Sequence, residues 1–335
     1  MAAAASTAAG ARPWLRRLAG VLLVSLAGGC ALGPRIDLQA LAPEPTRLAG
    51  VPFFPQTAFQ CGPAALAGVL GAAGVEATPE ALSPQVYLPG RRGSLQLELV
   101  AATRRAGRLP YLIDPAPEAL FAELRAGRPV LVLQNLRTPG FPVWHYAVVV
   151  GHDPARGRVV LNSGTREGMR MPARSFLRTW DWAERWALVA LTPGELPARA
   201  DPRRYAETVA AFEPVAGAAA AELAWRAALR AWPQDPRPWL GLGNLAYADG
   251  ERHEAARRYA EGLVRAPGDA VLANNLASVL GELGCPRAGE RVLRPVAAAL
   301  PDDSPWAEAL ATTLGELAGR DGADDESCRA LLRTD

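Results

Sequence analysis

The 335 residues of this chain are enough for two domains and a sizeable buried core. Half of the residues are hydrophobic, and the 30 prolines and 32 glycines are scattered without the regular period of a fibrous protein. The formal net charge of +2 excludes a strongly basic protein and gives no support for nucleic-acid binding.

Residues 1–30 carry the pattern of a bacterial lipoprotein signal. Three arginines precede Leu18–Leu26, an apolar run too short to span a bilayer comfortably, and small residues then lead to Cys30. This arrangement resembles a signal that is cleaved before an acylated cysteine; an ordinary secretory signal with an incidental cysteine is the alternative. The resemblance implies a lipid anchor at Cys30. Because Ala31 is not the aspartate associated with inner-membrane retention, it also implies the outer membrane, facing the periplasm.

Residues 31–47 are rich in proline and small residues, which predicts a tether to the folded part of the chain. From 48 to 195, helical patterns come first and strands later, which is typical of an α+β domain. A final strand at 185–193 is expected to close the sheet. The other predicted helices are 61–70, 78–82, 94–106 (capped by Ser94), 117–126 and 176–186, and the other strands are 108–114, 129–136, 145–151 and 158–164.

Cys61 lies where an extended segment gives way to a helix. Gly62 can serve the turn, and Pro63 suits the first helical position. A sulfur at a helix N-terminus lies near unpaired N–H groups and the positive end of the helix dipole, which favour the nucleophilic thiolate. Gln56, five residues upstream, could donate its side-chain amide to an oxyanion. The pattern therefore predicts a nucleophilic cysteine, although a lone cysteine beside a helix is more often a small core residue.

A nucleophilic cysteine needs a base, and the chain holds three histidines. His145 begins and His152 ends an apolar run that predicts a buried strand, and His253 lies in a helical region. A cysteine on a helix followed much later by His145 on a strand is the order found in papain-like enzymes. We therefore expect His145 to be the base.

The residues Gln56, Cys61–Pro63 and His145–Tyr146 resemble the motifs of bacteriocin-processing (double-glycine leader) peptidases and their stand-alone relatives. The resemblance covers under half of the chain. It implies a papain-like fold with Gln56 as oxyanion donor, Cys61 as nucleophile and His145 as base. The family places an aspartate on the strand after the histidine, where this chain offers Asn162. An asparagine can hold an imidazole tautomer; Asp153, in a predicted turn, is the rival.

The final third of the chain carries an internal repeat. Pro233, Pro267 and Pro301 follow one another at intervals of 34 residues, the period of tetratricopeptide repeats. This predicts an all-α repeat domain over 201–320, followed by a tail at 321–335. Such repeats form a concave surface that can bind a protein partner, and a passive stabilising role is the alternative.

Cys285 and Cys328 lie in this last part of the chain, and an oxidising periplasm would allow them to pair. The sequence leaves their pairing open. The spacing of histidine, cysteine and aspartate fits no metal site, and no glycine-rich phosphate loop follows a strand. We therefore expect neither a cofactor nor a metal.

Together these patterns predict a membrane-anchored cysteine peptidase or amide hydrolase of the bacterial envelope. It would act on a peptide or protein substrate and could bind a further protein through its repeats. Family members that cleave double-glycine leaders are typically fused to transporter segments, and this chain shows no such segments, so that substrate is not favoured. The alternative is a catalytically inactive, peptide-binding scaffold that acts through its repeats.

Overall fold

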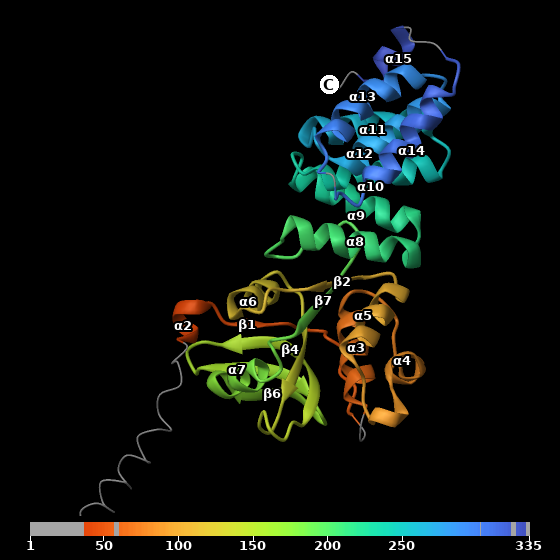
Figure 1. Cartoon of the computed structure of the whole chain (residues 1–335). Helices are drawn as coiled ribbons and strands as arrows, with labels where there is room; N and C mark the ends of the chain where they lie inside the picture. Colours follow the sequence, from red (N-terminus) through yellow and green to blue (C-terminus); the bar gives the residue numbers. More distant parts are fainter. Residues whose placement is uncertain (1–36, 57–59, 302, 323–325, 333–335) are drawn as a thin grey trace, which may run out of the picture.

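The computed structural model describes residues 37–56, 60–301, 303–322 and 326–332. A mixed helix-and-sheet domain comes first and an entirely helical region follows it, as the sequence predicts (Figure 1). The predicted signal and Cys30 lie outside the described residues. Among the described helices, none combines the length and the apolar character that crossing a bilayer requires.

The first helices form much as their sequence patterns indicate. Thr78 caps the second of them, because its Oγ1 accepts the N–H of Ala81. The expected cap at Ser94 is wrong: that helix begins at Gln96, after Leu95, and receives no side-chain cap. The helices of this domain are α3 (Cys61–Ala72), α4 (Pro79–Val86), α5 (Gln96–Arg105), α6 (Pro117–Arg125) and α7 (Ala173–Asp181).

One antiparallel sheet has the strand order β2-β7-β3-β4-β5-β6, and the short β1 pairs with β4. The expectation that the last strand closes the sheet is wrong, since β7 lies between β2 and β3. All five β7 residues are apolar and buried, which suits a central strand. The strands are β1 (Thr46–Arg47), β2 (Leu109–Leu112), β3 (Val130–Asn135), β4 (Trp144–Asp153), β5 (Arg158–Ser163), β6 (Arg166–Pro172) and β7 (Ala187–Leu191).

The segment predicted as a tether is folded from residue 37 onward. Asp37 caps the short helix α2 (Leu38–Leu41) by accepting two backbone N–H groups. Leu38 and Ala42 are buried in the core, and β1 then pairs with β4. The tether prediction fails here because two apolar side chains and one strand pairing attach the segment to the domain.

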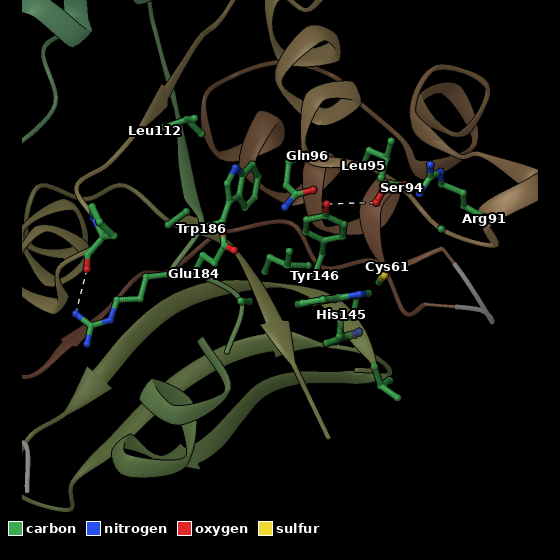
Figure 2. Close-up of a pocket in the computed structure, with 18 of the residues that line it drawn as sticks. Cys61, Arg91, Ser94, Leu95, Gln96, Leu112, His145, Tyr146, Glu184 and Trp186 are labelled. Carbon is green, nitrogen blue, oxygen red and sulfur yellow. Dashed lines mark hydrogen bonds between the residues drawn. The ribbon is translucent and has the colours of Figure 1, made fainter. Parts of the chain in front are cut away.

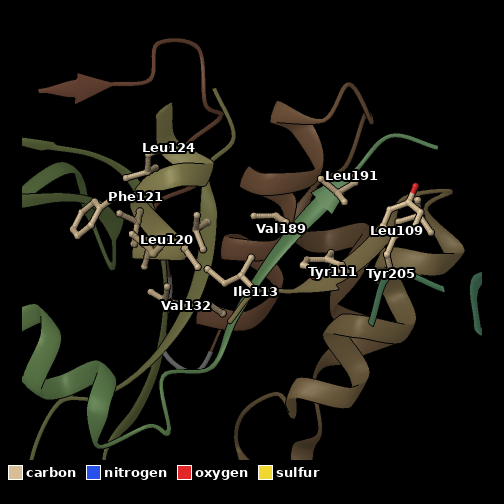
Figure 3. Close-up of a cluster of buried hydrophobic side chains, with 14 of the residues drawn as sticks. Leu109, Tyr111, Ile113, Leu120, Phe121, Leu124, Val132, Val189, Leu191 and Tyr205 are labelled. Carbon is tan, nitrogen blue, oxygen red and sulfur yellow. The ribbon is translucent and has the colours of Figure 1, made fainter. Parts of the chain in front are cut away.

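Successive β4 side chains point to opposite faces of the sheet. Tyr146 and Val148 pack with α3 and α5 in one core, whereas Ala147 and Val149 pack in a second core with α6 and α7. The second core continues into the helical region through Tyr205, which lies beside the β2 residues in Figure 3. Both faces of the strand that carries His145 are therefore covered.

The helical region is a structural repeat. Asp201, Asp235 and Asp269 are spaced by 34 residues, and each caps the first helix of a pair with its carboxylate. A disulfide joins Cys285 to Cys328, which the sequence had left open. The helices are α8 (Pro202–Ala216), α9 (Ala218–Ala231), α10 (Pro236–Ala248), α11 (Arg252–Arg265), α12 (Ala270–Glu282), α13 (Pro286–Ala299), α14 (Ala307–Ala318) and α15 (Glu326–Ala330).

Two helical glycines test how tightly the repeats pack. A Cβ on Gly241 of α10 would overlap the buried ring of Trp225, whereas a Cβ on Gly315 of α14 would meet no atom within 4 Å. We expect Gly241→Ala to lower the free energy of unfolding by about 1–3 kcal/mol through overpacking. Gly315→Ala should instead raise it by about 0.5–1 kcal/mol. Urea denaturation measures both, and equal stabilities of the two variants would contradict this packing.

Candidate active site

A cavity of about 1180 Å³ opens where β4 begins, and it holds three of the residues that the sequence singled out. Cys61 comes from α3, His145 from β4, and Gln56 from the extended segment before α3. Figure 2 shows the Cys61 sulfur on the same side of this cavity as His145. Asn162 and Asp153, both within the described chain, lie away from its lining. The size suits an extended ligand.

The backbone around Cys61 is closely packed. Gly62 lies inside α3 and not in a turn as expected, and a Cβ there would collide with the Ser94 side chain. Because Gly62 has no side chain, the segment before α5 can approach the start of α3. The Ser94 carbonyl accepts a hydrogen bond from the Tyr146 hydroxyl at 3.3 Å, so that α3, α5 and β4 meet beside the sulfur (Figure 2).

Cys61 is a free, half-buried cysteine. Burial raises the pKa of its thiol, and this effect exceeds the opposing one of the backbone N–H groups of Tyr146, Gly62 and Cys61 itself. The expected low pKa is therefore not found. Three backbone N–H groups do surround the sulfur, but their stabilisation of the thiolate is smaller than the cost of burying its negative charge.

His145 lies half-buried at the start of β4. Its Nε2 lies 2.9 Å from the Ser163 Oγ. Burial lowers the pKa of the imidazole below its ordinary value of 6.5. At neutral pH the site therefore contains a thiol and a neutral imidazole, so the proton of Cys61 would move to His145 during attack.

The two candidates for the third residue are engaged elsewhere. The Asn162 Oδ1 accepts the Gly168 N–H at 3.0 Å. Asp153 forms an ion pair with Arg156 in the turn after β4, and the guanidinium lowers the pKa of that carboxyl. In the described structure His145 bonds to neither, which differs from the expectation that Asn162 orients the ring.

Gln56 lies at the rim of the same cavity. Its backbone N–H donates to the Gly164 carbonyl at 3.1 Å, which attaches the segment before α3 to the end of β5. Gln56 belongs to the residues that line the cavity, where an oxyanion donor would have to lie. Residues 57–59, between Gln56 and Cys61, lie outside the described chain.

Sequence reasoning missed the wall of the cavity farther from Cys61. The helix predicted at 176–186 ends at Asp181, and the following turn brings Trp186 into the cavity, where its ring meets Tyr146 edge-on at 5.8 Å. Within the part of the chain that the structure describes, three residues other than glycine have positive φ, and all three line this cavity: Arg92, Glu184 and Arg185. Backbone strain of this kind concentrates at functional sites, and nothing in the local sequence indicates it.

No family model matches the chain, and neither does any curated protein. Among solved structures, the chain is similar to a candidate C39-like peptidase from Bacillus anthracis. The two are 18% identical with a TM-score of 0.37, and the match covers 44% of this chain and 98% of that one. Similarity at this level assigns no activity to the chain.

The raised pKa of Cys61 makes a prediction for its reactivity. A higher pKa means less thiolate at a given pH, so iodoacetamide should alkylate Cys61 more slowly in the folded protein than in urea at neutral pH. The folded rate should then rise at more alkaline pH. Mass spectrometry of the Cys61 peptide over a pH series measures this, with the Cys285–Cys328 disulfide left intact. Fast alkylation that is already constant near pH 6 would instead reveal a thiolate–imidazolium pair.

Proposed function

We propose that this protein is a cysteine peptidase or amide hydrolase with a papain-like site. The observation that carries the proposal is the meeting of Cys61, His145 and Gln56 in one cavity, although they come from separate parts of the chain. These are the nucleophile, the base and the oxyanion donor that the resemblance to bacteriocin-processing peptidases implies. A lone half-buried cysteine would not require the other two residues beside it.

In the proposed reaction, the Cys61 sulfur attacks the carbonyl carbon of an amide while His145 takes the thiol proton. The Gln56 side chain and the Cys61 backbone N–H stabilise the oxyanion. As the C–N bond breaks, His145 gives its proton to the leaving amine, which leaves a thioester on Cys61. Water then attacks the thioester with His145 again as base, which releases the acid and restores the thiol.

The cavity supports a peptide or protein as substrate. Its lining includes Leu112, Leu133 and Trp186, which offer apolar contacts to a substrate side chain. Val143, in the loop before β4, and Trp144, the first residue of β4, also line the cavity and are exposed. An open cleft that combines these apolar side chains with polar ones such as Arg92 and Gln96 suits an extended chain.

We further propose a lipid anchor at Cys30 in the outer membrane, facing the periplasm. The support is the signal-like run of residues 1–30 and the disulfide between Cys285 and Cys328, which requires an oxidising compartment.

We also propose that the 34-residue units are tetratricopeptide repeats that bind a protein partner. The support is the repeated aspartate caps and the helix pairs that follow them.

The anchor predicts that Cys30→Ser moves the protein from the membrane fraction to the soluble fraction, because no acyl chains are attached. The matched control is Cys61→Ser, which removes a different cysteine and should leave the protein with the membranes. Immunoblots of fractionated cells measure both variants. Retention of the Cys30→Ser protein in membranes would contradict the anchor.

The hydrolytic function predicts that Cys61→Ala and His145→Ala each lower kcat/KM at least about 1,000-fold, because each removes a group that takes part in bond making. The matched control is His253→Ala, which changes an exposed histidine of α11 and should leave hydrolysis unchanged. Mass spectrometry of a peptide library incubated with each protein measures the cleavage.

Hydrolysis that survives Cys61→Ala would contradict this function. A folded wild-type protein that binds library peptides and cleaves none would point to the alternative, a peptide-binding scaffold that acts through its repeats.

A further inference from the structure

We propose that Ser163, and not Asn162, is the residue that positions the His145 imidazole. The inference rests on the proposed function, because positioning has a role only where His145 acts as a base. Its direct basis is the 2.9 Å separation between the His145 Nε2 and the Ser163 Oγ. Ser163 acts through His145 and is therefore a positioning residue.

The alternation of side chains along β4 and β5 dictates this pairing. Ala147 and Val149 share a face with His145, two and four residues along β4. On β5 the residues of that face are Val159 and Leu161, since they belong to the same core. Ser163 is the next residue of this series and thus shares the face with His145.

The strand register places the two side chains within reach of each other. Val149 pairs with Leu161 and Val148 with Asn162, so the next step of the register brings Ser163 level with Ala147. His145 is then the diagonal neighbour of Ser163 on the same face. Diagonal neighbours have Cα atoms about 7–8 Å apart, a distance that an imidazole and a short hydroxyl side chain span.

Asn162 is on the other face of β5, where Val160 belongs to the core against α3. Its Oδ1 accepts the Gly168 N–H at the point where the β5–β6 register shifts, between Leu161 and Ser163. Asn162 therefore stabilises the irregular β5–β6 turn. A rotation of its side chain toward His145 would break this bond and leave a buried amide group unpaired.

The contact with Ser163 decides which ring nitrogen receives the proton of Cys61. If Nε2 carries hydrogen and donates it to the Ser163 Oγ, Nδ1 has a free lone pair for the thiol proton. Ser163 is only 8% exposed, so little water competes for this hydrogen bond. A hydroxyl holds the ring without adding a negative charge, and burial is the one cause that lowers the pKa of His145.

The experiment measures the tautomer of His145 by ¹⁵N NMR in the full-length, detergent-solubilised protein with labelled histidine. Only three histidines contribute signals, and His145→Gln identifies the one of interest. We expect the Nε2–H tautomer in the wild type and in Ser163→Thr, which keeps the hydroxyl. Ser163→Ala should shift the population toward Nδ1–H, while Asn162→Ala should leave the His145 tautomer as in the wild type.

Ser163→Asp provides a second readout, because a carboxylate beside the ring would favour imidazolium and raise the pKa of His145. The NMR titration of His145 should then move to higher pH. Where hydrolysis is measurable, Ser163→Ala should lower kcat about 10- to 100-fold with KM unchanged, and Ser163→Thr should restore most of it.

A His145 tautomer that is unchanged by Ser163→Ala, or one that changes with Asn162→Ala instead, would overturn the proposal, and so would a titration that is unchanged by Ser163→Asp. The NMR readout needs no substrate. A protein without hydrolytic activity would therefore contradict the proposed function and still test the contact with Ser163.

Discussion

The alternation of side chains along β4 is the constraint on which the site depends. Both faces of this strand are buried, so a shift by one residue would move each of its side chains into the opposite core and disturb the packing of both. Tyr146 faces α3, and its backbone N–H meets the Cys61 sulfur. The neighbouring His145 has its Nε2 2.9 Å from the Ser163 Oγ. The register of β4 therefore positions both the proposed base, His145, and the Tyr146 backbone N–H beside the Cys61 sulfur.

Burial also sets the charges of the site. It raises the pKa of Cys61 and lowers that of His145, and both changes favour the uncharged forms. No carboxylate among the described residues bonds to His145, so its positive form gains no ion pair. Cys61 and His145 therefore form no ion pair before the reaction. The free-energy cost of separating their charges arises when the sulfur attacks the substrate. A bound substrate that places its carbonyl oxygen against Gln56 and the Cys61 N–H would offset part of that cost.

The helix at Cys61, the strand at His145 and the 34-residue period could be predicted from the sequence because each has a local signal. These signals are a proline near a helix start, an apolar run, and prolines that recur at a fixed interval. The sequence-based prediction misplaced the final strand, since only packing shows that Ala187–Leu191 belongs between two other strands. It assigned Asn162 from the family's pattern for the strand after the histidine, whereas in the structure the Ser163 Oγ lies 2.9 Å from the His145 Nε2. The left-handed residues Glu184 and Arg185 carry no local signal, because tertiary contacts impose their conformation.

The helical region is not an independent appendage to the sheet domain. Tyr205 and Phe212 of α8 are completely buried in the core that also contains Tyr111 of β2, and the Tyr111 hydroxyl accepts the Asp201 N–H at 3.1 Å. Arg204 of α8 pairs with Asp114 at 2.5 Å and lines the cavity that holds Cys61. Because α8 is the first helix of the repeat, the position of the repeats relative to the cleft is set by buried contacts. The first repeat helix and the cleft therefore keep one relative orientation, which a flexible linker between two separate domains would not provide.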